Sequence, residues 1–195
     1  MDVNSRHIAT DIAECAFFIV LMVAATYIQI PFPLVPLTFQ TVVSVLAGLM
    51  LGAKKGIISM AVYCFMGLVG LPVFTAGGGI VYVLKPSFGY ILGFIISAGV
   101  AGVIAGKANL PLWRYVVAGL AAFLADYAVG IPYCMIAAKF LNVENLTGLL
   151  VTGNLVYMPK DAVLSVLAAF LAKTVLPVVR KDKNIKIKTG NAELK

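Results

Sequence analysis

The sequence predicts an all-α integral membrane protein in which about six helices cross the bilayer. Of its 195 residues, 62% are hydrophobic and 12% are charged, and the mean hydropathy is +1.01. Soluble domains are about 45–50% apolar and about 25% charged. Because one crossing needs about 20 apolar residues, the length leaves no room for a soluble module. Residues 1–195 are therefore expected to form a single transmembrane domain.

Six apolar segments are the expected helices: about Ile12–Ile30, Phe39–Gly52, Ile57–Leu71, Ser87–Gly106, Tyr115–Ala138 and Ala162–Val179. Acidic side chains at the start of the first segment favour a helix N-terminus. Three prolines, Pro31, Pro33 and Pro36, end that segment, because proline lacks an amide donor and restricts the residue before it. Asp126 and Pro132 interrupt the fifth segment. Residues 139–154 are too polar to span and are expected to lie on the membrane surface.

A long connection, Gly70–Tyr90, joins the third and fourth segments and is the stretch that stands out most. Three consecutive glycines, Gly77, Gly78 and Gly79, would weaken a helix by roughly 1 kcal/mol each relative to alanine, which indicates a shaped loop. Aromatic residues are spaced through it: Phe74, Tyr82, Phe88 and Tyr90. The stretch is either a plain connection or a place where backbone amides and aromatic faces hold a small flat molecule.

A few polar side chains interrupt the apolar segments. Gln40 lies at the mouth of the second segment, where its amide is expected to bond another helix or a ligand. Asp126 lies within the fifth, and a carboxylate in a membrane helix costs about 2.5–3.5 kcal/mol on insertion scales, so it should face a cavity or a polar partner. Lys160 and Asp161 begin the last segment about 100° apart, which favours contacts with different groups over contact with each other. A snorkelling lysine and a helix-capping aspartate are the alternative.

The distribution of basic residues predicts the orientation. If both termini are cytoplasmic, most of the fifteen lysines and arginines fall on the inner side, as the positive-inside rule requires. The net charge of +7 then reflects this asymmetry and a basic tail at about 180–195 that can rest on anionic lipid. Nucleic acid is not needed to explain it.

This orientation brings the proline turn, the glycine loop and the Lys160–Asp161 pair to the same outer face. An acid, a base, an amide and aromatic rings together suit a small amphiphilic molecule with an anionic end and a hydrogen-bonding head.

Disulfide and metal chemistry have less support in the sequence. The three cysteines are widely spaced in apolar runs, which argues against disulfides and a metal site.

Two other classes of function remain open from the residues alone. A small intramembrane enzyme would need a nucleophile with a base, or a metal. The one histidine is His7, and neither H-E-x-x-H nor G-x-S-x-G occurs, so only an Asp126–Asp161 dyad is conceivable. A passive channel formed by an oligomer is the other possibility. The chain also lacks a G-x-x-x-x-G-K-[S/T] phosphate loop, so partners would have to hydrolyse any ATP.

Long ordered strings give the chain a family resemblance. Pro31–Gln40 (PFPLVPLTFQ), Ala47–Gly52 (AGLMLG), Gly67–Phe74 (GLVGLPVF) with the glycines that follow, and Lys85–Phe94 (KPSFGYILGF) resemble the BioY family. These are biotin-specific substrate-binding subunits of energy-coupling factor (ECF) transporters. The resemblance implies a six-helix S-component bundle in a prokaryotic plasma membrane, with biotin as the transported ligand and no cofactor. It also implies a membrane coupling subunit, contacted by Ala9 and Ala13, and ABC-type ATPase subunits.

The resemblance also suggests how the candidate residues would meet biotin, which carries a ureido ring and an acyl tail ending in a carboxylate. Asp161 or Asp126 would accept from the ureido N–H groups, and Lys160 would meet the carboxylate. Gln40 and the amides of Gly77, Gly78 and Gly79 would supply other hydrogen bonds, while Tyr82, Phe88 and Tyr90 would pack on the fused rings. The family often places a lysine after its Pro-x-Asp helix start; Leu164 and Ser165 follow here, and Lys160 is the expected substitute.

Overall fold

The computed structural model describes residues 3–31, 35–106, 110–142 and 157–177, with side chains described from residue 8 onward. Helices dominate these ranges: α1 (Val3–Tyr27), α2 (Gln40–Leu51), α3 (Ala53–Leu68), α4 (Phe88–Ala105), α5 (Leu112–Phe140) and a last helix over 157–177. The remaining elements are short: β1 (Gln29–Ile30), β2 (Leu37–Thr38) and the 3-10 helix η1 (Ile80–Leu84).

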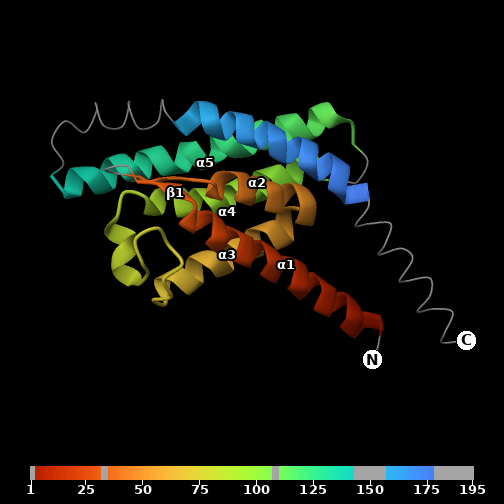
Figure 1. Cartoon of the computed structure of the whole chain (residues 1–195), viewed down its shortest axis with the longest axis horizontal. Helices are drawn as coiled ribbons and strands as arrows, with labels where there is room; N and C mark the ends of the chain where they lie inside the picture. The colour runs from red at the N-terminus through yellow and green to blue at the C-terminus, as the bar shows by residue number, and fades with distance from the viewer. Residues whose placement is uncertain (1–2, 32–34, 107–109, 143–156, 178–195) are drawn as a thin grey trace, which may run out of the picture.

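The helices run back and forth along the long axis of the molecule (Figure 1). The start of α1 and the end of the last helix lie at one end, on the right of the view. The β1–β2 pair and the loop that contains η1 lie at the opposite end, where α2 and α4 begin. The turns that the sequence predicted for one face are therefore gathered at one end of the bundle.

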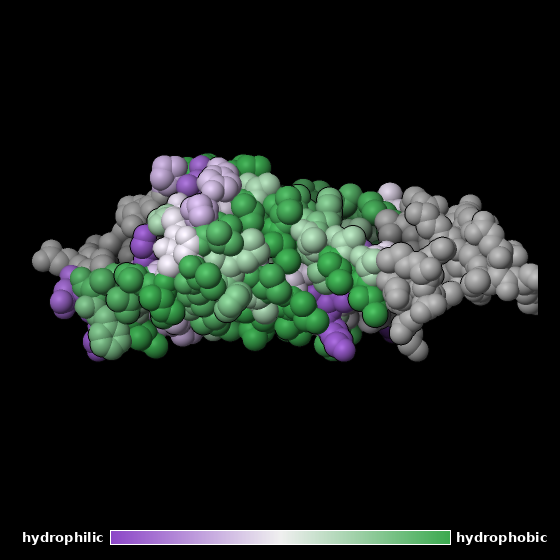
Figure 2. All heavy atoms as spheres, turned by 90° about the horizontal axis from the view of Figure 1, so that it is seen from below, coloured by the Kyte–Doolittle hydropathy of each residue, from purple (hydrophilic) through white to green (hydrophobic). Residues whose placement is uncertain are grey.

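The exterior is apolar over a wide area (Figure 2). Many large hydrophobic side chains are exposed, including Phe17, Phe65 and Val103 at 62%, 67% and 72%. In the described ranges, three helices are long and apolar enough to cross a membrane: Ile8–Tyr27, Phe88–Ala105 and Leu112–Phe140. Such a surface is unsuited to water and suits contact with lipid.

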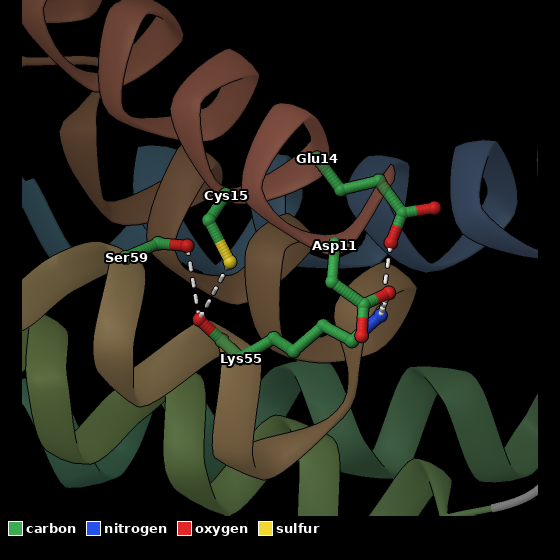
Figure 3. A network of polar contacts seen from close by, with 5 residues as sticks. All are labelled: Asp11, Glu14, Cys15, Lys55 and Ser59. Atoms are coloured by element: carbon green, nitrogen blue, oxygen red, sulfur yellow. Dashed lines mark hydrogen bonds and ion pairs between the residues drawn. The ribbon is translucent and has the colours of Figure 1, made fainter. Parts of the chain in front are cut away.

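Helix α1 is attached to the bundle differently at its two ends. Its second half buries Phe18 and Met22, whereas its first half contacts α3 through charged side chains (Figure 3). Lys55 of α3 forms ion pairs with Asp11 and with Glu14, the latter at 3.0 Å between Nζ and Oε2. The first half of α1 has no buried apolar side chain among its described residues. The two ion pairs of Lys55 therefore hold this half against α3.

Small residues let α4 approach its neighbours closely. A Cβ added to Gly48 of α2 would lie 2.2 Å from the carbonyl oxygen of Ala98, and one on Gly102 would lie 2.1 Å from the backbone nitrogen of Ala53. Close backbone approach of this kind is a usual way for membrane helices to pack. The glycines and alanines at these contacts thus serve close helix packing.

Several boundaries differ from those expected. Helix α1 ends at Tyr27, because the backbone then extends into β1, which pairs with β2 and closes the proline turn. Helix α5 continues through Pro132 to Phe140, and the last helix begins at residue 157, with Pro159 in its first turn. The polar region at 143–154, the basic tail and Pro33 lie outside the described residues.

Candidate functional site

A cavity of about 510 Å³, including its open mouth, lies at the end of the bundle where the loops gather. Every helix of the described residues except α1 contributes to its wall. The polar lining residues are Thr38, Gln40, Thr41, Tyr63, Thr75, Tyr82, Ser87, Tyr90, Tyr127, Tyr157, Lys160 and Asp161.

A charged pair stands in this wall at the start of the last helix. The Lys160 Nζ lies 2.7 Å from Oδ1 of Asp161 and donates to the carbonyl of Thr38 at 2.5 Å. Tyr127 donates its hydroxyl proton to the other oxygen of Asp161 at 2.7 Å. The expectation that Lys160 and Asp161 would contact different groups rather than each other was wrong, because the long lysine side chain folds back onto its neighbour's carboxylate.

Asp126 lies behind the wall and does not line the cavity. It is completely buried, and Thr41 donates to its Oδ2 at 3.3 Å. Its Oδ1 has no hydrogen-bond partner among the described residues, and a Cβ on Gly93 would lie 2.1 Å from that oxygen. Thr41, which does line the cavity, therefore connects the cavity wall to this buried carboxyl group.

Gln40 bonds another helix, which is one of the two roles that the sequence left open, and it also lines the cavity. Its Nε2 donates to the Tyr63 hydroxyl of α3 at 2.7 Å. Tyr63 in turn donates to the carbonyl of Val73 at 2.9 Å, and Thr26 Oγ1 of α1 lies 3.0 Å from the same phenolic oxygen.

Aromatic rings form one side of the site. Tyr82 and Tyr90 line the cavity, as does Tyr127, whose ring packs edge-on against Tyr90 at 5.6 Å between centroids. Behind Tyr82, the ring of Phe74 lies 4.6 Å away. Phe88 is buried outside the cavity lining and packs on Tyr133, with centroids 5.8 Å apart.

The consecutive glycines lie in the loop beside the cavity but not in its lining. Gly77 and Gly79 have φ angles of 96° and 105°, which residues with a side chain rarely adopt. Their amides already donate within the protein, Gly77 to Phe74 at 3.1 Å and Gly79 to Gly67 at 2.7 Å. A Cβ on Gly78 would lie 2.1 Å from the carbonyl oxygen of Leu71. In this structure these residues shape the loop that carries Tyr82.

Sequence reasoning missed several cavity residues, above all Tyr63, Tyr127 and Tyr157. Each has its hydroxyl bonded to a distant segment, as when Tyr157 donates to the carbonyl of Val35 at 2.5 Å. A buried tyrosine normally needs a hydrogen-bond partner for its hydroxyl. A tyrosine within an apolar segment was therefore the only feature of the sequence that could have pointed to these residues. At the other end of the molecule, Ala9 and Ala13 are exposed on the outer side of α1.

The fold and the cavity together define a multi-pass helical membrane protein with a small-ligand site at one end. The sequence profile of the BioY family matches residues 1–181, and the chain belongs to this family.

Named relatives and a solved structure agree with this assignment. A probable biotin transporter BioY of Lysinibacillus sphaericus is 39% identical over 175 residues, covering 88% of this chain and 89% of the relative. One from Pyrococcus horikoshii is 32% identical over 166 residues, covering 85% and 95%. The crystal structure of the S-component for biotin from an ECF-type ABC transporter superposes with a TM-score of 0.68 at 23% identity, covering 90% of this chain and 94% of that one. At that identity the likeness concerns the fold. The relatives are named as transporters and not as enzymes.

Proposed function

We propose that this protein binds biotin and serves as the substrate-binding subunit of an ATP-driven ECF transporter that takes biotin into the cell. The observation that carries the proposal is the cavity itself. In a chain of the BioY family, it places an acid–base pair, an amide and aromatic rings around one space. These groups match the donors, acceptors and ring system of biotin.

In this proposal the two ends of biotin meet the two members of the charged pair. Asp161 lines the cavity and accepts from a ureido N–H, while Lys160 leaves Asp161 and meets the tail carboxylate. Asp161 then keeps hydrogen-bond donors from Tyr127 and from the ureido ring, which matters because its side chain is only 5% exposed. Asp126, behind Thr41, supports the wall from the buried side. Tyr82 and Tyr90 pack on the fused rings, and the glycines hold the loop in shape around them.

The topology and the partners belong to the same proposal. We infer six crossings with both termini on the cytoplasmic side, supported by the alternating directions of the helices in Figure 1. Ala9 and Ala13, exposed on α1, then meet a membrane coupling subunit. ABC-type ATPase subunits hydrolyse the ATP, and the whole chain is one transmembrane domain.

The role of Lys160 is tested by binding measurements on two ligands, biotin and biotin amide, in which the carboxylate is masked. Lys160→Ala should weaken biotin far more than the amide, because only biotin offers a carboxylate to the lysine. Lys139→Ala is the matched control, since Lys139 is exposed and does not line the cavity. Equal losses for both ligands would remove Lys160 from the carboxylate site.

A further inference from the structure

Asp126 of α5 is enclosed by protein on every side. The residue is completely buried, and one carboxyl oxygen, Oδ1, has no hydrogen-bond partner among the described residues. The other oxygen, Oδ2, has the Thr41 hydroxyl of α2 at 3.3 Å. Buried polar atoms are normally hydrogen-bonded, so this single long contact stabilises an ionised carboxylate poorly.

The groups that face Asp126 from the described residues carry no positive charge. Gly93 of α4 presents only its backbone, and the titratable groups nearby are the Asp161 carboxyl of the last helix and the Tyr127 hydroxyl. Lys160 forms its ion pair with Asp161 instead. An ionised Asp126 would therefore be a buried charge with a like charge as its neighbour, and a carboxyl group in that position takes up a cation or a proton.

A metal cation does not fit beside the oxygen that lacks a partner. A Cβ built on Gly93 would lie 2.1 Å from Oδ1 of Asp126 and 2.8 Å from its backbone oxygen, so the side chain is packed tightly against α4. The described residues also contain no group of three or more His, Cys, Asp or Glu side chains that could hold a metal ion. A proton needs neither that space nor further ligands.

The contacts of Thr41 favour a proton on Asp126 as well. Its hydroxyl bonds Asp126 and also contacts the carboxylate of Asp161. The single hydroxyl proton completes a hydrogen bond to only one of two carboxylates. With a proton on Asp126 the direction of the first bond reverses: Asp126 donates to Thr41, and Thr41 donates to Asp161. Both contacts are then satisfied.

We propose that Asp126 is a proton-binding site inside the helical bundle, occupied in the ligand-free protein and linked to the cavity wall by the Thr41 hydroxyl. The proton comes from water and forms one O–H bond on the carboxylate, with no other bond made or broken. Asp161 is then the one acidic charge in the cavity lining of the described residues, and no second carboxylate competes for Lys160. The inference goes beyond the proposed function, because it holds for any ligand of the cavity.

Infrared difference spectroscopy of the full-length protein tests the occupancy directly. At neutral pH, wild type minus Asp126→Asn should show the C=O stretching band of a protonated carboxylic acid. Thr41→Val should shift this band, because it removes the hydrogen-bond partner. Asp11→Asn is the matched control, since Asp11 is a half-exposed carboxylate paired with Lys55, and its loss should leave the band unchanged. A wild-type spectrum without such a band would overturn the inference.

Stability measured against pH gives an independent readout, with unfolding by denaturant in detergent as the assay. An aspartate in the unfolded chain is ionised above about pH 5, so folding takes up one proton if Asp126 is neutral in the native state. The wild-type folding equilibrium constant, relative to that of Asp126→Asn, should then fall about tenfold per pH unit as the pH rises from about 5 to about 7. Equal pH dependence of the two proteins would contradict the proposal.

If Asp126→Asn does not fold, the infrared band of the wild type and its shift in Thr41→Val decide the question, and a band that Thr41→Val leaves in place would overturn the link to the cavity. Neither measurement uses biotin. A failure here therefore leaves the proposed function standing, and a failure of biotin binding leaves the proton site standing.

Discussion

Replacing Lys160 by methionine should destabilise the ligand-free protein, because it leaves a buried carboxylate without its counter-charge. Asp161 has a side chain only 5% exposed and an ion pair of 2.7 Å with Lys160, which also donates to Thr38. Removing one partner of a fully buried pair costs about 3–5 kcal/mol. The Lys160 side chain is 22% exposed, so solvent screens part of the interaction and the expected loss is about 2–3 kcal/mol.

At about 2–4 °C per kcal/mol for a chain of this size, that loss corresponds to a fall of about 4–12 °C in melting temperature. The assay is thermal unfolding in detergent of protein shown to carry no bound biotin. Asp161→Asn alone should cost less, and adding it to Lys160→Met should recover most of the loss, because no charge is then left unpaired. A Lys160→Met protein that melts with the wild type, or a double variant whose losses simply add, would refute the proposed pairing energy.

Two further substitutions test the attachment of α1 and the loop beside the cavity. Lys55→Met should release the first half of α1 and speed alkylation of Cys15 several-fold, with the exposed Lys54→Met as control. An unchanged Cys15 rate would show that the ion pairs do not hold this segment. Gly67→Ala would place a Cβ 2.0 Å from the Phe74 ring and should weaken biotin about tenfold by shifting that ring toward Tyr82. Wild-type affinity would show that the loop absorbs the change.

Much of the helical architecture could be predicted because long apolar runs bounded by proline, glycine or charge leave few alternatives in a membrane. The expected segment Ser87–Gly106 corresponds to α4 at Phe88–Ala105. Some helix boundaries were not predicted because local hydrogen bonding determines them. One example is the end of α1 at Tyr27, after which the backbone pairs as β1 with β2. The 3-10 helix within the glycine-rich loop was also missed, since five residues give no usable periodicity.

The candidate site could be predicted in part, because a polar residue is conspicuous against an apolar background. Gln40, Lys160 and Asp161 were recognisable in this way, and the structure places them in one cavity lining. Tyr82 and Tyr90 were recognisable from the glycine-rich stretch that contains them, but Tyr63, Tyr127 and Tyr157 were not, because a tyrosine in an apolar run is indistinguishable from core. Tyr127 and its partner Asp161 are 34 positions apart, a contact that only the assembled bundle creates.

The most direct test of the central claim is isothermal titration of the purified protein with biotin, after any retained biotin has been shown to be absent. We expect saturable 1:1 binding with sub-micromolar affinity, a binding free energy beyond about −8 kcal/mol. Measurement at a second temperature guards against an enthalpy that happens to be close to zero. No heat at either temperature would contradict the assignment of this cavity to biotin.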